Sequence, residues 1–166
     1  LLPAKQVPQE VKIGDVLKVF LYKDSKDRLI ATTNTPKLQL EQLAVLEVLE
    51  IGKIGAYLDW GLEKDLFLPF KEMTRKVEPG DEILVTLYID KSRRLCATMK
   101  GIYDLLSKES PYKEGDTVQG RVYEFSDNFG TFIAVDDRYS AMIPRHEDCS
   151  FLRIGDIIEA RVTKVK

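Results

Sequence analysis

An internal repeat constrains the fold of this chain more than any other feature of its sequence. A Gly-Asp pair occurs at positions 14–15, 80–81 and 155–156, and Leu-Pro or Ile-Pro occurs at 2–3, 68–69 and 143–144. The copies lie 66 and then 75 residues apart, and the second and third copies align without a gap from about 45/120 to 91/166. A period of this length suits a small domain rather than one turn of a solenoid. We therefore expect copies of one small domain in tandem.

The repeat predicts where the domains begin and end. Residues 1–40 form the C-terminal half of a first unit together with a linker, and residues 41–101 form a complete second unit. Residues 102–111 form a linker with a short helix, and residues 112–166 form a third unit that ends before its last strand. The first residue is not Met, so the sequence is expected to be an excerpt of a longer protein.

Each unit reads as five short strands. In the second unit the first strand is Leu43–Ile51, and the alternation of apolar and polar residues over 56–60 is the period-2 pattern of a half-buried strand. A short third strand is expected over 66–68. The core-facing residues expected in the other strands of the three units are Ile83, Val85, Leu87, Leu95, Ala97, Met99, Val118, Gly120, Val122, Ile158, Ala160, Val162, Leu17, Val19, Leu21, Leu29 and Ala31. Many short strands separated by Gly turns favour a small closed or nearly closed barrel.

The composition excludes several classes of protein. An apolar content of 44% and a charged content of 31% are typical of a soluble globular chain, and no apolar run is long enough to span a bilayer. No signal-peptide pattern occurs, and the two cysteines, Cys96 and Cys149, form neither a CxxC pair nor a disulfide framework. We therefore expect a cytoplasmic protein without a metal, without a cofactor and without a membrane or small-molecule partner.

Charge limits how this chain could bind nucleic acid. The net charge is −2, and the excess of basic over acidic residues is confined to residues 1–40. Nucleic-acid binding by bulk attraction needs a basic chain. Any nucleic-acid site is therefore expected to be a local patch whose affinity depends on salt.

A glycine-centred strand carries the candidate patch. The stretch 128–134 places Phe129 and Phe132 around Gly130, and residues 53–59 repeat it with Tyr57 at the position of Phe132. Flat rings on a polar surface stack bases. Because Thr131, Ile133 and Val135 form the core face, Phe132 is expected to point outward, whereas Phe129 requires a bulge at Gly130. The alternative is that these rings are ordinary core residues, as is expected of Trp60.

Several motifs resemble those of a known RNA-binding repeat. They are Gly120-Arg121-Val122, the stretch 128–133, Met142-Ile143-Pro144, and Gly-Asp after Leu152-Arg153-Ile154. They resemble the repeat of ribosomal protein S1, which is an OB-fold barrel. Tandem units with Leu-Pro in the third strand and Arg94-Leu95-Cys96-Ala97-Thr98 in the fifth resemble the conserved virulence factor B family of bacterial proteins. The resemblance implies an all-β chain of tandem five-stranded OB-fold barrels, the first and last incomplete here.

The resemblance also implies a function. Proteins of this kind hold single-stranded RNA and regulate gene expression, including virulence genes, after transcription, without catalysis and with a winged-helix domain that this sequence lacks. The stacking pair of such repeats corresponds to Phe129 and Phe132, and to Ile54 and Tyr57 in the second unit. Ile54 removes a ring from the second unit. Pro144 and Pro69 stand where many such repeats carry a ligand-contacting His, which puts base specificity in doubt.

Basic residues near these rings are the expected phosphate contacts. They are Lys53, Lys71, Arg94, Arg121 and Arg145. The single histidine, His146, lies beside Glu147 and Asp148, but neighbours on one loop do not converge on one point, so catalysis is not expected. The alternative function is a non-catalytic scaffold for protein interactions whose barrels have lost RNA binding. In either case we expect a monomer in solution.

Overall fold

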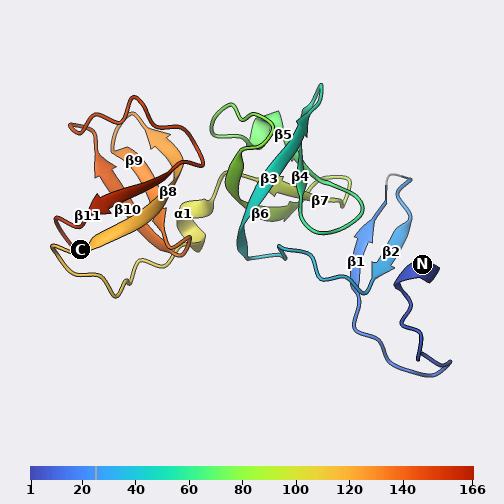
Figure 1. Cartoon of the computed structure of the whole chain (residues 1–166). Coiled ribbons are helices and arrows are strands. Elements are labelled where there is room, and N and C mark those ends of the chain that lie inside the picture. Colours follow the sequence, from blue (N-terminus) through green and yellow to red (C-terminus); the bar gives the residue numbers. More distant parts are fainter. Residues whose placement is uncertain (25) are drawn as a thin grey trace.

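The computed structural model describes residues 1–24 and 26–166 (Figure 1). Its strands form three sheets that follow one another along the chain: a two-stranded hairpin, a five-stranded sheet and a four-stranded sheet. We call these parts unit one, unit two and unit three. The all-β class expected from the sequence is confirmed, because the helices are short and few in the part of the chain described.

Unit two is a nearly closed barrel. It consists of β3 (Leu43–Ile51), β4 (Gly55–Asp59), β5 (Leu66–Pro69), the 3-10 helix η2 (Phe70–Glu72), β6 (Glu82–Ile89) and β7 (Leu95–Thr98). The strands run antiparallel in the order β5-β4-β3-β6-β7. The sheet curls so that Met99 N donates to Glu72 O at 3.0 Å, and Thr98 Oγ1 donates to Glu72 Oε2 at 2.8 Å. This confirms the five-stranded barrel.

The core of unit two follows the predicted alternation. Ala56, Leu58 and Trp60 are all buried, whereas Tyr57 and Asp59 between them are partly exposed. The buried core residues from the other strands are Leu46, Val48, Leu66, Leu68, Ile83, Val85, Leu87, Ala97 and Met99. The outer face of the barrel is therefore left to the intervening side chains.

Unit three repeats the first four strands of unit two. Its strands are β8 (Thr117–Ser126), β9 (Gly130–Val135), β10 (Tyr139–Pro144) and β11 (Ile157–Arg161), in the order β10-β9-β8-β11. Ile133 and Val135 belong to the core inside the sheet, as predicted, and Thr131 is also buried. Phe132 and Ala134 face the opposite side.

Unit one is shorter than the sequence pattern predicted. It contains the 3-10 helix η1 (Ala4–Gln6), β1 (Phe20–Lys23) and β2 (Leu29–Thr32). The sequence predicted a strand through Leu17 and Val19, but this strand begins only at Phe20. Among the described residues, no strand lies beside 12–19 in the way that β3 lies beside β6 in unit two. For the same reason Leu21 and Leu29, both predicted to face inward, are 53% and 57% exposed. This part of the prediction is wrong.

Hydrogen bonds show that unit one nevertheless repeats unit two. Asp24 Oδ1 accepts from the backbone N–H of Lys26 and Arg28, and Asp90, 66 positions later, accepts in the same way from Ser92 and Arg94. The hydroxyls of Thr32 and Thr98 donate to Gln6 and Glu72, which are also 66 positions apart. The repeat found in the sequence therefore extends to the side-chain contacts.

The ungapped alignment of units two and three is wrong by one residue in the first strand. Val48 pairs with Leu58, and Val122 pairs with Ile133, so the strand register places β8 74 positions after β3. The later strands keep the shift of 75. The cause is the hairpin loop: Gly52 N bonds to Gly55 O around two residues, whereas Ser126 pairs with Gly130 around three.

Units two and three share a second core. The linker helix α1 (Ile102–Leu105), predicted as a short helix, buries Ile102 together with Leu84 of β6 and Tyr123 of β8. The outer face of one barrel thus packs on the outer face of the other, with α1 between them (Figure 1). Gly155 fits the same contact, because an added Cβ would lie 2.3 Å from Glu82 O. Arg153 also reaches across to Glu78, 3.1 Å away.

Candidate nucleic-acid interface

The loop between β8 and β9 presents one ring of unit three to solvent. Phe129 lies in this loop rather than in a strand, and its side chain is 63% exposed. Ser126 Oγ accepts from the backbone N–H of Asn128 at 3.3 Å and of Phe129 at 3.2 Å, which fixes the loop. The bulge expected at Gly130 lies instead in β8, where the register shifts between Val122 and Glu124.

Gly130 is required at the end of this loop. Its φ of +137° is unfavourable for other residues, and an added Cβ would lie 2.1 Å from Ile143 O. The same Cβ would lie 3.1 Å from the backbone N of Arg145. The bare backbone therefore lets the chain after β10 lie against the loop that carries Phe129.

Phe132 lies on the outer face of β9, as the alternation predicted, but other rings cover it. Its ring centroid is 6.0 Å from that of Tyr103 in α1 and 6.1 Å from that of Tyr123, whose pKa burial raises. The ring centroid of Phe129 lies 6.5 Å from that of Phe132. Phe132 is only partly exposed as a result, so Phe129 is the more accessible of the two rings.

Unit two carries a pair of rings, of which the sequence predicted only one, Tyr57. Tyr57 lies on the outer face of β4, and its ring centroid is 5.5 Å from that of Phe67 on β5. An added Cβ at Gly52 would lie 3.2 Å from the Tyr57 ring, and one at Gly55 would lie 2.6 Å from the Phe67 ring. Both rings therefore rest on the glycines of the β3–β4 hairpin. The alternation in β5, with Leu66 and Leu68 buried, was the signal for Phe67.

Three of the predicted basic residues are exposed near these rings. Lys53 lies at the tip of the β3–β4 hairpin, Lys71 lies in η2, and Arg145 follows β10. Phe70 N donates to Ile54 O at 3.2 Å, which holds the start of η2 against the hairpin tip. Lys53 and the start of the helix that carries Lys71 thus lie at the same end of unit two, whereas Arg145 belongs to unit three.

Arg121 is buried, and its guanidinium group is bonded to other residues of the protein. It is 8% exposed, and its Nε lies 3.0 Å from Asp137 Oδ1. Its Nη1 donates to Gly155 O at 3.2 Å and lies 3.8 Å from Glu82 Oε2 across the inter-unit contact. The structure gives this predicted phosphate contact an internal role.

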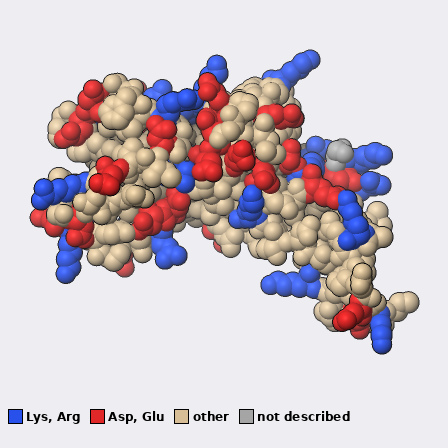
Figure 2. Space-filling model, viewed as in Figure 1, with Lys and Arg blue, Asp and Glu red and all other residues tan. Residues whose placement is uncertain are grey.

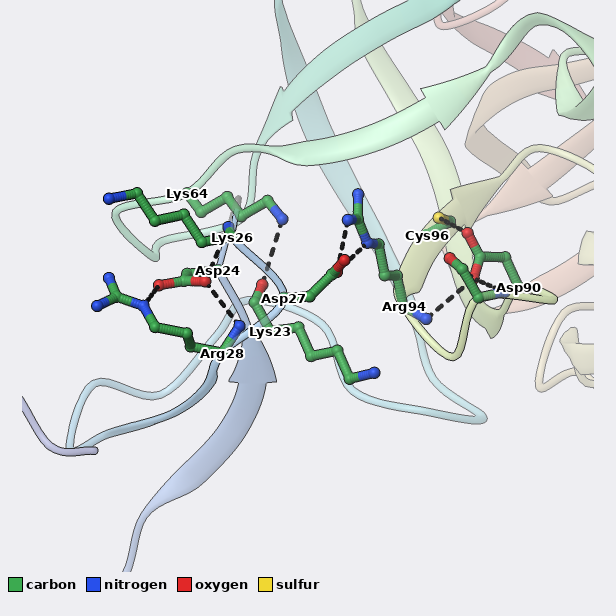
Figure 3. A network of polar contacts seen from close by, with 10 residues as sticks. Lys23, Asp24, Lys26, Asp27, Arg28, Lys64, Asp90, Arg94 and Cys96 are labelled. Atoms are coloured by element: carbon green, nitrogen blue, oxygen red, sulfur yellow. Dashed lines mark hydrogen bonds and ion pairs between the residues drawn. The ribbon is translucent and has the colours of Figure 1, made fainter.

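Arg94 links units one and two. Its Nε donates to Asp27 Oδ1 at 2.7 Å, and Figure 3 shows its side chain pointing from the β6–β7 turn to the β1–β2 turn. In the same network Lys64 Nζ donates to Lys23 O at 3.2 Å. To contact a phosphate, Arg94 would therefore have to give up its ion pair with Asp27.

Acidic side chains lie beside the rings of unit two. Glu50 pairs across the strands with Tyr57, and Glu47 pairs with Asp59. Burial, together with Asp59 and Glu50, raises the pKa of Asp65. In the face shown in Figure 2, acidic and basic residues are interspersed, and the middle of the view is mainly acidic. Such carboxylates oppose a phosphate backbone.

The described residues assemble no metal site. No group of three or more His, Cys, Asp or Glu in the described chain is arranged to hold a metal ion, and His146 is exposed beside Glu147. Burial and Asp90 raise the pKa of Cys96 to about 11, so this thiol stays protonated at neutral pH. Among residues 1–24 and 26–166, no helix is long and apolar enough to cross a membrane.

The chain is similar to a known domain family and to curated proteins that share one name. The sequence model described as "S1 domain" matches residues 1–34 and 42–100. "Conserved virulence factor B" from Staphylococcus aureus strain N315 is 23% identical, over 92% of this chain and 53% of that protein. The protein of the same name from Staphylococcus epidermidis strain ATCC 12228 is also 23% identical, over 92% and 54%. This chain thus spans about half the length of these curated relatives.

A solved structure shares the fold. It is described as the crystal structure of a multidomain protein with nucleic acid binding domains from Streptococcus pneumoniae TIGR4. The TM-score is 0.70 at 23% identity, and the match covers 98% of this chain and 59% of that one. Since the sequence model matches more than half of the 166 residues and the curated relatives bear the name that the motifs suggested, this chain belongs to the S1 domain family and shares the tandem S1-like OB-fold repeats of the conserved virulence factor B proteins.

Proposed function

We propose that this chain binds single-stranded RNA, with unit three providing the main stacking surface. The observation that carries the proposal is the β8–β9 loop. There Phe129 is exposed, Phe132 lies next to it, and the backbone of Arg145 lies against the loop. An exposed ring with a cation beside it is what sequence-tolerant binding of single strands requires.

Membership of the S1 domain family supports nucleic-acid binding, as does the fold shared with a protein that has nucleic acid binding domains. The relatives are named conserved virulence factor B, which fits a link to virulence. Our proposal is that the chain regulates expression after transcription, including that of virulence genes. We propose that this role is carried out in the cytoplasm by a monomer without enzymatic activity.

Binding of fluorescent oligouridylate and oligoadenylate, followed by anisotropy at about 50 and about 200 mM KCl, tests the proposal. Wild type should bind both strands, and more weakly at the higher salt. Phe129→Ala should weaken binding about fivefold or more, because a stacked base contributes about 1–3 kcal/mol. Lys26→Gln, an exposed cation in unit one, is a control that should change binding little. Absence of binding by wild type at low salt would overturn the proposal.

A scaffold for protein interactions is the second candidate. It is favoured by the carboxylates around Tyr57 and by the ion pair that occupies Arg121. The same experiment separates the two functions, since a scaffold would leave both oligonucleotides free at low salt.

A further inference from the structure

We infer that the nucleic-acid surface of unit three extends onto the linker helix α1, where Tyr103 supplies a third stacking ring and Lys108 a phosphate contact. This inference rests on the proposed function of the Phe129 loop and adds two residues of the linker to it. No motif in the sequence pointed to either residue.

The rings form a continuous row. Phe129 lies 6.5 Å from Phe132, and Phe132 lies 6.0 Å from Tyr103. The two outer members of the row are the accessible ones: Phe129 is 63% exposed and Tyr103 is 44% exposed. Phe132 is therefore the floor between two rings that face solvent.

The linker holds Tyr103 rigidly in this row. Ile102 and Leu106, on either side of it in the sequence, are buried in the core between units two and three. Ser107 then pairs with the edge of β10: Ser107 N donates to Arg138 O at 2.8 Å, and Ser140 N donates to Ser107 O at 2.9 Å. Helix α1 is thus a fixed part of the surface, and a fixed ring binds a base without a further cost of ordering.

Lys108 supplies the charge. Its Nζ lies 4.2 Å from the centroid of the Tyr103 ring, and the residue is exposed. A cation over an exposed ring contributes less than a stacked base. In the complex, a base takes the place of the amine above Tyr103, and the amine moves to the adjoining phosphate.

Two substitutions at Tyr103 test the ring, with labelled oligouridylate as the probe. Tyr103→Ala should weaken binding about fivefold or more, whereas Tyr103→Phe, which keeps the ring, should bind like wild type. Leu105→Ala, which removes an exposed apolar side chain from the same helix, is the matched control and should bind like wild type. Circular dichroism and thermal unfolding check that each variant is folded.

Lys108→Gln tests the charge. A phosphate contact should reduce the slope of log affinity against log salt by about 0.7. Ultraviolet cross-linking of wild type to thiouridine-labelled oligouridylate, with peptide mapping, needs no variant and should label Tyr103 as well as the loop at 127–129.

The outcomes distinguish this inference from the function on which it rests. If Phe129→Ala weakens binding while Tyr103→Ala does not, or if cross-links occur only outside 101–111, the extension is wrong and RNA binding stands. If wild type binds neither oligonucleotide at low salt, the proposed function and the extension both fail.

Discussion

Units two and three have the same frame but offer different surfaces. Strand pairing makes Ile54 equivalent to Phe129 at the loop tip, and Tyr57 equivalent to Phe132 on the second strand. Unit two has an aliphatic tip and a ring pair, Tyr57 with Phe67, beside carboxylates. Unit three has an aromatic tip and a strand ring covered by α1.

The difference teaches that position in the repeat does not decide which ring is exposed to solvent. What packs on the outer face decides it. Phe132 is held between Tyr103 and Tyr123, whereas Tyr57 rests on the glycines of its own hairpin. In unit three the ring on the strand, Phe132, therefore serves packing, and the ring at the loop tip, Phe129, is the one exposed to solvent.

The largest expected effect is on stability. Phe132→Ala should lower the free energy of unfolding by about 2–3 kcal/mol, below the range for a fully buried Phe because this ring is partly exposed. Tyr57→Ala should cost only about 1 kcal/mol, since fewer neighbours lose contacts. Urea denaturation measures both, and Phe132→Leu is the control that keeps apolar volume. Equal losses for the two alanine variants would contradict the comparison.

The second effect is a gain of binding. Ile54→Phe gives unit two the tip ring of unit three and should raise affinity for oligouridylate about fivefold, the equivalent of one stacked base. Ile54→Leu, an aliphatic control, should leave affinity unchanged. If both variants bind like wild type in anisotropy measurements, the carboxylates near Tyr57 outweigh the added ring.

The third effect is on salt dependence. Phe70 occupies in unit two the place of Arg145, 75 positions later, just after the third strand. Phe70→Arg should make log affinity fall more steeply with log salt, by about 0.7. Phe70→Gln separates the charge from the loss of the ring. An unchanged slope would show that this position does not face the phosphates.

The smallest effect concerns Asp65. Its raised pKa means that its ionised form is disfavoured in the folded state, so stability falls as the pH rises through the folded pKa. Asp65→Asn should therefore raise the free energy of unfolding at pH 7 by less than about 1 kcal/mol, which is measured as a higher melting temperature. The gain should vanish below about pH 3, where Asp65 is protonated in both states. A gain that persists there would mean that the amide acts by packing instead.

The sequence predicted the parts of the fold that depend on period. The first strand of unit two, Leu43–Ile51, has the expected bounds, and the core face of β9 follows the alternation. The shift of β8 was not predictable, because a hairpin loop of three residues instead of two leaves no mark in the pattern of apolar residues. The expected strand before Phe20 failed because a strand depends on its partner as well as on its own residues.

The candidate site was predictable only in outline. The sequence identified Phe129, Phe132 and Tyr57, because rings beside a glycine are visible in the pattern. It ranked Phe132 above Phe129, because the cover that α1 provides comes from the tertiary structure. Tyr103 was overlooked for the same reason, since a linker residue has no period to mark it.

The contact at Gly155 has a further consequence. The backbones of the two units meet there, and Arg153 crosses to Glu78. With RNA as the proposed ligand of both surfaces, the chain would act as a divalent binder whose second site sees a raised effective concentration. A strand long enough to reach both units should then be held far more tightly than a short one, and the separation of the Phe129 and Tyr57 surfaces sets the length at which that gain begins.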